Sequence, residues 1–467
     1  MKDSAAVIVK RTPMIRVPLM LRLGAVAALA AVAACASVPT AAPPTVSLAA
    51  APYAPDSGSA AIRCGTLIDG VSSSARKAVT VLVRNGRITA VGDHVAVPSG
   101  VSELDLSGYT CLPGLIDMHT HLTHAIDDTA NLSVYYRRTA EEQGRIARAN
   151  AEATLQAGFT TTRDVGTYIA WVDRDLRDAI NAGAVAGPRL QVCGFYLTIP
   201  GGGGDLVIPG HPESEIPPQV RMGVARGADA FRGKAELAIA GGADFLKVIA
   251  SGAVLAFGGV PGSPEMTQQE IAAVVDVAHR NGRKVAAHAH GEQSIRDAIL
   301  AGVDTIEHAS LIDDEGIALA KQRDVALAMD VYNGDYIDTV GRAQKWPEEF
   351  LRKNVETTEA QRQGFTKAHA AGVPLVYGTD ASVYPHGWNA RQFPIMVERG
   401  MSPMEAIQSA TSVAAHYLGW GDRIGSVKPG HLGDLIAVQG DPLQDITVLQ
   451  HVAVVIKGGL AFKLPNP

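Results

Sequence analysis

Short apolar runs that alternate with turn residues occur near both ends of the chain. Near the start, apolar segments at residues 78–83 and 87–91 flank Asn85-Gly86. Asn-Gly supplies the positive φ angles of a tight turn, so this pattern predicts a β-hairpin. Three segments near the C-terminus have the same character: 434–438, 452–456 and 460–462. We therefore expect both chain ends to build one small β-sandwich domain, over residues 60–112 and 425–467.

A different repeat fills residues 113–424. A helical stretch ends at a glycine, a short apolar strand follows, and a polar residue comes after the strand. The glycines of five such repeats are Gly158, Gly242, Gly282, Gly302 and Gly372. With three further apolar segments, eight strands are predicted, at residues 115–119, 160–164, 189–193, 245–248, 285–288, 305–308, 325–329 and 375–380. Strands and helices in alternation predict an α/β fold, a TIM-like (β/α)8 barrel with loop insertions at 201–204 and 257–264.

The first residues have the character of an export signal. Arg16 and Arg22 precede an alanine-rich apolar run, 23–34, that is too short to span a bilayer. We expect a signal peptide over residues 1–35. Its end, Val-Ala-Ala-Cys35, resembles a bacterial lipobox, in which Cys35 would carry a lipid anchor to the membrane; ordinary cleavage that discards Cys35 is the alternative.

The expected location follows from this signal. Residues 36–59 are rich in Ala, Pro, Ser and Thr and predict a flexible linker. We expect an exported protein, in the bacterial periplasm or anchored to the outer membrane.

Composition narrows the class of protein. The chain has 467 residues, 47% of them hydrophobic, and 48 glycines, which suits a globular α/β enzyme. Its net charge of -6 gives no reason to expect a nucleic-acid partner. Cys64, Cys111 and Cys193 are an odd number at wide spacings. We expect each to be a buried apolar residue, with any disulfide optional.

Polar residues at the predicted strand ends are mostly of metal-ligand type. In a (β/α)8 barrel these ends face one rim, so their side chains converge although they are far apart in sequence. The candidate ligands are His119, His121, Lys247, His288, His308 and Asp380. A single histidine near a strand end is more often a packing or surface residue. Four histidines and an aspartate at such positions together predict a metal site.

Lys247 is the most informative of these residues. It lies among Phe245, Leu246, Val248 and Ile249, where an unpaired ammonium would be costly to desolvate. One solution is an ordinary ion pair. The other is carboxylation of the amine, which gives an anionic carbamate able to bridge two metal ions. Two divalent ions balanced by a carbamate, Asp380 and a hydroxide leave a small net charge, which favours the carbamate.

Several motifs resemble one known family. Residues 113–121, Pro-Gly-Leu-Ile-Asp-Met-His-Thr-His, and 378–380, Gly-Thr-Asp, resemble signatures of the amidohydrolase superfamily, and the resemblance spans residues 61–464. Residues 245–248, 288–291 and 306–308 resemble the group of binuclear Xaa-Pro dipeptidases and ochratoxin-hydrolysing amidohydrolases. Imidazolonepropionase and dihydroorotase are similar by fewer motifs.

The resemblance implies a metal centre and a reaction. His119, His121, Lys247 and Asp380 would hold one divalent ion, and Lys247, His288 and His308 the other, with Lys247 carboxylated by CO2. Zinc is expected, and manganese, cobalt or iron would also suit these ligands. Asp380 would be catalytic, taking a proton from the attacking hydroxide between the two metal ions and passing it to the leaving amine.

The substrate and its contacts are less tightly specified. The resemblance implies cleavage of the amide or peptide bond to a C-terminal amino acid in a dipeptide or N-acyl amino acid, ochratoxin A-type amides included, by a homo-oligomer. His290 is expected to bind this small-molecule substrate or to support a ligand, and Tyr332 to donate to it or to pack in its loop. His124, Tyr384 and His386 are expected to be surface residues of the rim.

Two other functions stay open at this point. The same metal centre could hydrolyse a cyclic amide or a lactone, as in imidazolonepropionase, because the loops and not the ligands select the substrate. A non-catalytic binding lipoprotein is the other alternative. It predicts a damaged ligand set, whereas all six positions here carry competent residues.

Overall fold

A computed structural model of the protein describes residues 50–465. The predicted signal peptide, Cys35 and the linker up to residue 49 lie outside these residues. Within the described part, no helix is long and apolar enough to span a membrane.

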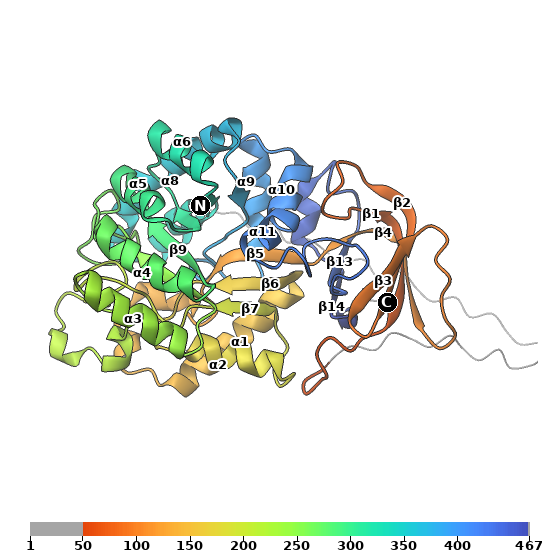
Figure 1. Ribbon diagram of the computed structural model, residues 1–467, viewed down its shortest axis with the longest axis horizontal. Coiled ribbons are helices and arrows are strands. Elements are labelled where there is room, and N and C mark those ends of the chain that lie inside the picture. Colours follow the sequence, from red (N-terminus) through yellow and green to blue (C-terminus); the bar gives the residue numbers. More distant parts are fainter. Residues whose placement is uncertain (1–49, 466–467) are drawn as a thin grey trace, which may run out of the picture. The chain divides into compact units, whose positions relative to one another are not determined.

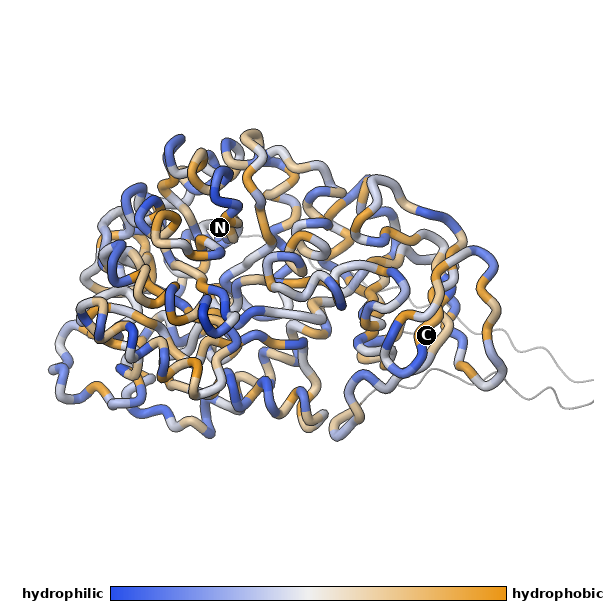
Figure 2. Tube along the Cα trace, in the orientation of Figure 1, coloured by the Kyte–Doolittle hydropathy of each residue, from blue (hydrophilic) through white to orange (hydrophobic). Residues whose placement is uncertain are grey.

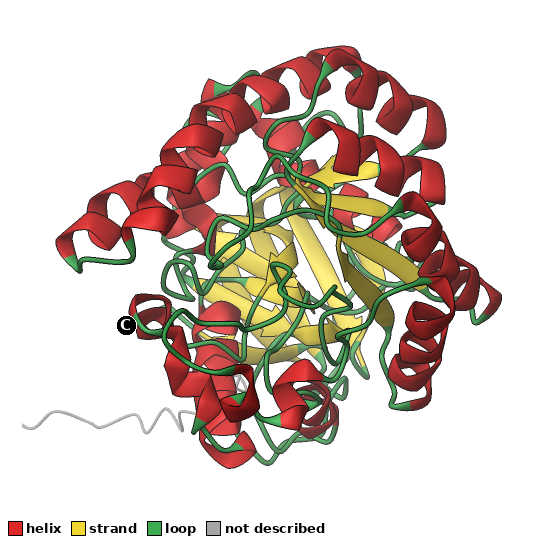
Figure 3. Ribbon diagram, turned by 90° about the vertical axis from the view of Figure 1, so that its left-hand side faces the viewer, coloured by secondary structure: helices red, strands yellow, loops and turns green. Residues whose placement is uncertain are grey.

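Eight parallel strands form the barrel, and helices surround them (Figure 3). The strands are β5 (Leu115–Thr120), β6 (Phe159–Asp164), β7 (Arg189–Val192), β8 (Phe245–Ile249), β9 (Lys284–Ala289), β10 (Thr305–His308), β11 (Ala326–Ala328) and β12 (Leu375–Val376). They form two sheets, β5-β6-β7 and β8-β9-β10-β11-β12. Parallel bridges from Leu197 to Val248 and from Thr120 to Ala381 close the ring. The predicted (β/α)8 barrel is confirmed.

Amphipathic helices cover the outside of the barrel. The helices of the described residues are α1 (Ala140–Gln156), α2 (Val172–Asn181), α3 (Ala228–Ala240), α4 (Gln268–Arg280), α5 (Glu292–Ala301), α6 (Asp314–Arg323), α8 (Glu348–Ala371), α9 (Gln392–Glu398), α10 (Pro403–Ser409) and α11 (Ser412–Tyr417), with the four-residue α7 (Asn333–Tyr336) in the loop after β11. Hydrophobic and hydrophilic residues alternate along them, so one face of a helix can pack on the strands (Figure 2). Gly302 and Gly372 end α5 and α8 with φ angles of 95° and 75°, as the sequence pattern predicts.

Shorter helical turns occur mainly in the loops. Single 3-10 turns span Ile126–Ala130, Leu132–Tyr136, Glu213–Glu215, Pro218–Arg221, Asn389–Arg391 and Ile446–Gln450, and a π-helical turn spans Ile337–Gly341.

Both chain ends contribute to a separate seven-stranded sheet (Figure 1). Its order is β15-β14-β13-β4-β1-β2-β3, from β1 (Ala60–Leu67), β2 (Arg76–Arg84), β3 (Arg87–Gly92), β4 (Ser102–Pro113), β13 (Leu435–Val438), β14 (Val454–Lys457) and β15 (Leu460–Lys463). Apolar side chains of these strands form their own core. The predicted β-sandwich domain from both ends is confirmed, including the hairpin at Asn85-Gly86. The domain boundaries stay a prediction, since only Gly114 separates β4 from the barrel strand β5.

All three described cysteines are buried, as predicted, and two of them also form a disulfide, which the sequence left open. Cys64 of β1 and Cys111 of β4 form a disulfide, with their Cα atoms 5.8 Å apart. The two strands pair in parallel, and this long-range pairing brings together cysteines that are 47 residues apart. Cys193 is free and buried, as predicted.

Candidate active site

The six predicted ligands all line one cavity at the carboxyl ends of the barrel strands. Each is placed there by a strand or by the residues directly after it: His119 and His121 by β5, Lys247 by β8, His288 by β9, His308 by β10 and Asp380 by β12. The parallel strands therefore gather side chains from a span of more than 250 residues into one site.

His119, His121 and Asp380 form one side of this site. The Nε2 atoms of His119 and His121 lie 3.3 and 3.2 Å from Asp380 Oδ1. Burial alone would raise the pKa of Asp380, but the two imidazoles hold it well below the usual value. His119, His308 and Asp380 present one donor atom each within 4.8 Å of one another, a spacing that can hold a metal ion.

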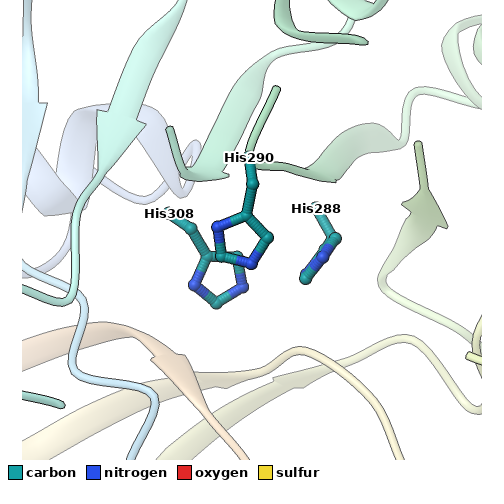
Figure 4. A group of neighbouring side chains, drawn as sticks. All are labelled: His288, His290 and His308. Atoms are coloured by element: carbon teal, nitrogen blue, oxygen red, sulfur yellow. The ribbon is translucent and has the colours of Figure 1, made fainter. Parts of the chain in front are cut away.

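His288, His290 and His308 form a second group, in which the three rings approach one another (Figure 4). Their donor atoms also lie within 4.8 Å of one another. Burial lowers the pKa of His288 and of His290 well below the usual value. The two rings are therefore neutral, and a neutral imidazole nitrogen can ligate a metal.

One buried nitrogen atom in this cavity, that of the Lys247 amine, lacks a partner among the described residues. Lys247 is 1% exposed, and its Nζ atom has no hydrogen-bond partner in the described part of the chain. Burial lowers the pKa of Lys247 to about 8. No carboxylate of the described part forms an ion pair with this amine, which excludes the ordinary ion pair considered above. An unpartnered buried amine amid histidines fits a site built for a metal centre.

Glu307, for which the sequence predicted no role, orients the ring of His119 through its Nδ1 atom. His119 Nδ1 lies 2.9 Å from Glu307 Oε2, while Arg163 and Thr305 donate to Glu307 Oε1, each at 2.6 Å. Burial alone would raise the pKa of Glu307, but Arg163 and His119 keep it well below the usual value. An ionised acceptor on Nδ1 directs the lone pair of Nε2 toward the cavity.

Equivalent contacts orient the other rings. His308 Nδ1 lies 2.9 Å from Asp330 Oδ1, which also accepts a hydrogen bond from Gln361 at 2.8 Å. Two further rings have such a contact: His121 Nδ1 lies 2.9 Å from the Gly166 carbonyl oxygen, and His290 Nδ1 lies 2.8 Å from Ser310 Oγ. Asp330 directly follows the predicted strand 325–329, which is the sequence signal that could have identified it.

An aromatic wall borders the histidines. His124 stacks between His121 and Tyr168, with centroids 5.0 Å away on each side. Tyr135 packs against Tyr168, and the Tyr196 hydroxyl lies 3.2 Å from His121 Nδ1. Sequence reasoning missed these tyrosines, although Tyr168 and Tyr196 come shortly after β6 and β7. The expectation of surface roles is wrong for His124 and for Tyr384, because both are buried.

Tyr332 is not brought to the cavity. Its hydroxyl accepts a hydrogen bond from Arg391 at 3.1 Å, and its ring packs edge-on against Tyr384. The next residue, Asn333, lines the cavity instead and donates from Nδ2 to Asp330 and, at 3.1 Å, to Asp380 Oδ2. This placement counts against a substrate contact by Tyr332.

Comparison with known proteins identifies the family. A family model described as the amidohydrolase family matches residues 110–461. The chain belongs to the amidohydrolase family. It is 31% identical to an ochratoxinase of Aspergillus niger over 430 residues, 87% of either chain.

Solved structures of amidohydrolases agree with this assignment. A crystal structure of a Xaa-Pro dipeptidase with methionine bound in its active site is 34% identical, with a TM-score of 0.81 over 87% of this chain and all of that one. The crystal structure of A. niger ochratoxinase is 27% identical, with a TM-score of 0.76 over 88% and 96% of the two chains. The predicted superfamily, its subgroup and a hydrolase that acts on amide bonds are thereby confirmed.

Proposed function

We propose that this protein hydrolyses the amide or peptide bond to a C-terminal amino acid in dipeptides or N-acyl amino acids, ochratoxin A-type amides among them. The observation that carries the proposal is the convergence of six metal-ligand side chains in one cavity, with the amine of Lys247 buried and without a partner. The named relatives, an ochratoxinase and a Xaa-Pro dipeptidase, support the same reaction class.

The chain's donors suit two divalent metal ions. We assign His119, His121, Lys247 and Asp380 to one ion and Lys247, His288 and His308 to the other, with Lys247 carboxylated by CO2. Lys247 lines the same cavity as both groups of histidines. Imidazoles with carboxylate-type oxygens suit zinc, and manganese, cobalt or iron can also use such ligands.

When bound, the ions would polarise the scissile carbonyl and lower the pKa of a water molecule. Proton movement is the task of the protein. Asp380 Oδ1 faces His119 and His121, whereas its Oδ2 accepts the hydrogen bond from Asn333. With one oxygen fixed in this way, the carboxylate is held ready to take a proton from the attacking water and to deliver it to the leaving nitrogen.

Substrate contacts come from the remaining walls of the cavity. His290 uses Nδ1 toward Ser310, so its Nε2 is left for the carboxylate of the amino acid. Of the described residues that line the cavity, none is an arginine, which makes His290 the main candidate for this contact. The aromatic side chains of Tyr135, Tyr168 and Tyr196 also line the cavity, which favours an aromatic or apolar acyl group.

We also propose that the protein is exported. Support comes from the signal-like N-terminus and from the Cys64–Cys111 disulfide, since structural disulfides form in oxidising compartments such as the periplasm. A lipid anchor at Cys35 and a homo-oligomeric state stay predictions.

A substrate panel tests the proposed reaction. Purified, metal-replete protein is assayed on dipeptides, N-acyl amino acids, lactones and hydantoins. We expect turnover of linear amides with a free C-terminal carboxylate, and at least a hundredfold loss on Asp380→Asn. The exposed Asp314→Asn is the matched control and should keep full activity. Turnover of cyclic compounds alone, or of none, would overturn the proposal.

A further inference from the structure

A second cavity lies at the opposite end of the barrel from the ligand histidines. Its lining includes Arg189, the first residue of β7, Asp244, which directly precedes β8, and Arg283, which directly precedes β9. The proposed ligands occupy the carboxyl ends of the same strands. A strand rises about 3.3 Å per residue, so the length of β9 separates Arg283 from His288 by roughly 16 Å. This cavity is therefore independent of the proposed catalytic site.

Two of the five arginines that line this cavity are fully engaged. Arg189 donates to both oxygens of Asp56 and of Asp434, at 2.6 to 2.9 Å. Arg177 contacts Asp178 at 2.8 Å and Asp244 at 2.7 Å. All three aspartates of the lining are thus already paired with one of these two arginines. No carboxylate of the lining is left over for the other three cations.

The other three arginines, Arg87, Arg283 and Arg423, form no ion pair within residues 50–465, and all three are exposed. Arg87 donates only to the Gly430 carbonyl, at 2.8 Å, and Arg423 lies over the ring of Trp420 at 4.4 Å. The backbone of Leu432 connects Arg87 and Arg423. It forms a β-bridge with Arg87, and its N–H donates to the carbonyl of Arg423 at 2.8 Å. Three arginine residues whose side chains have spare donors therefore line one cavity.

The charge of this hollow is opposite to that of the chain. The lining holds five arginines and three aspartates, whereas the full sequence has a net charge of -6. A concave site lined by one sign of charge concentrates ions of the other sign. Guanidinium groups also present planar pairs of donors that match the oxygens of a phosphate.

We propose that this cavity binds a small, multiply charged oxyanion, either phosphate or the phosphate group of an ester. Arg87, Arg283 and Arg423 supply the donors, and Trp420 keeps the Arg423 guanidinium in place by stacking. This binding is a property separate from amide hydrolysis.

Calorimetric titration of the metal-replete, full-length protein with inorganic phosphate at low ionic strength tests the proposal. We expect a Kd of about 1 mM or tighter. The double variant Arg283→Gln, Arg423→Gln should bind at least tenfold more weakly while its peptidase activity is unchanged. The matched control is Arg145→Gln, Arg148→Gln, which removes the same charge from two exposed arginines of α1 that form no ion pair within the described residues. This control should bind phosphate as the parent does.

Two further arms locate the anion and its source. Phosphate binding should persist in Lys247→Ala. Its loss in that variant would place the phosphate at the metal centre, and unchanged binding in the double variant would place it elsewhere; either result would overturn the proposal. Sedimentation with phosphatidylglycerol vesicles distinguishes a lipid headgroup from a soluble phosphate. If the parent protein sediments with the vesicles and the double variant does not, the ligand is a lipid headgroup. If the parent binds phosphate but does not sediment with the vesicles, the ligand is a soluble phosphate. If the parent does neither, the proposed site is refuted.

Discussion

Replacing Glu307 with glutamine tests how a buried carboxylate orients His119. Glu307 is fully buried and takes hydrogen bonds from His119, Arg163 and Thr305. Glutamine keeps the size of the side chain but removes the charge and one acceptor oxygen. The 2% exposed Arg163 then loses its counter-charge. Breaking a buried ion pair costs about 3–5 kcal/mol of stability. Loss of the acceptor behind a metal-binding histidine weakens metal affinity by about 10–100-fold.

Two measurements on the same variant separate these effects. Urea denaturation gives the change in unfolding free energy, and titration of metal-free protein with zinc against a chelator gives the affinity. Glu315→Gln is the control, because Glu315 is exposed and lies 3.5 Å from Arg296, where an ion pair contributes about 1 kcal/mol at most. Zinc affinity and stability equal to those of the parent protein would refute the role of Glu307.

Three further predictions follow from the described contacts. Cys64→Ser with Cys111→Ser opens a loop of 47 residues and should lower the unfolding free energy by about 4 kcal/mol in urea denaturation, with unchanged activity of the folded protein. Burial, aided by Arg189, lowers the pKa of Lys457 to about 7. Below pH 7 the protonated Lys457 destabilises the folded state by its full amount, and this penalty decreases as pH rises toward the unfolded pKa of about 10.4. The unfolding free energy of the parent should therefore rise by several kcal/mol relative to that of Lys457→Met across this pH range. Parallel stability curves would contradict this. Tyr332→Phe should change kcat/KM less than about twofold, because its hydroxyl faces Arg391 and not the cavity; a tenfold loss would restore Tyr332 as a substrate contact.

The parts of the fold that the sequence predicted have local causes. A glycine such as Gly302 ends its helix through its own φ angle, and the apolar run after it forms the next strand. Because barrel strands run parallel, residues that end them, such as His288 and His308, must share a rim. The location of the candidate ligands followed from this geometry alone.

The missed features depend on contacts between distant segments. Cys64 meets Cys111 only because β1 pairs with β4. Glu307 precedes His308 in sequence, yet its side chain contacts His119, because the closed barrel brings the distant strand β5 close to β10. His124 is buried because the loop after β5 folds against Tyr168. Neither hydrophobic periodicity nor residue spacing contains this information.

Metal analysis of Lys247→Ala beside the parent protein is the most direct test of the proposed two-ion centre. The parent should carry about two divalent ions per chain. The variant should lose both bound metal and amide hydrolysis while it stays folded, since the buried amine has no other partner in the described structure. A variant that retains two ions and full turnover would contradict the account.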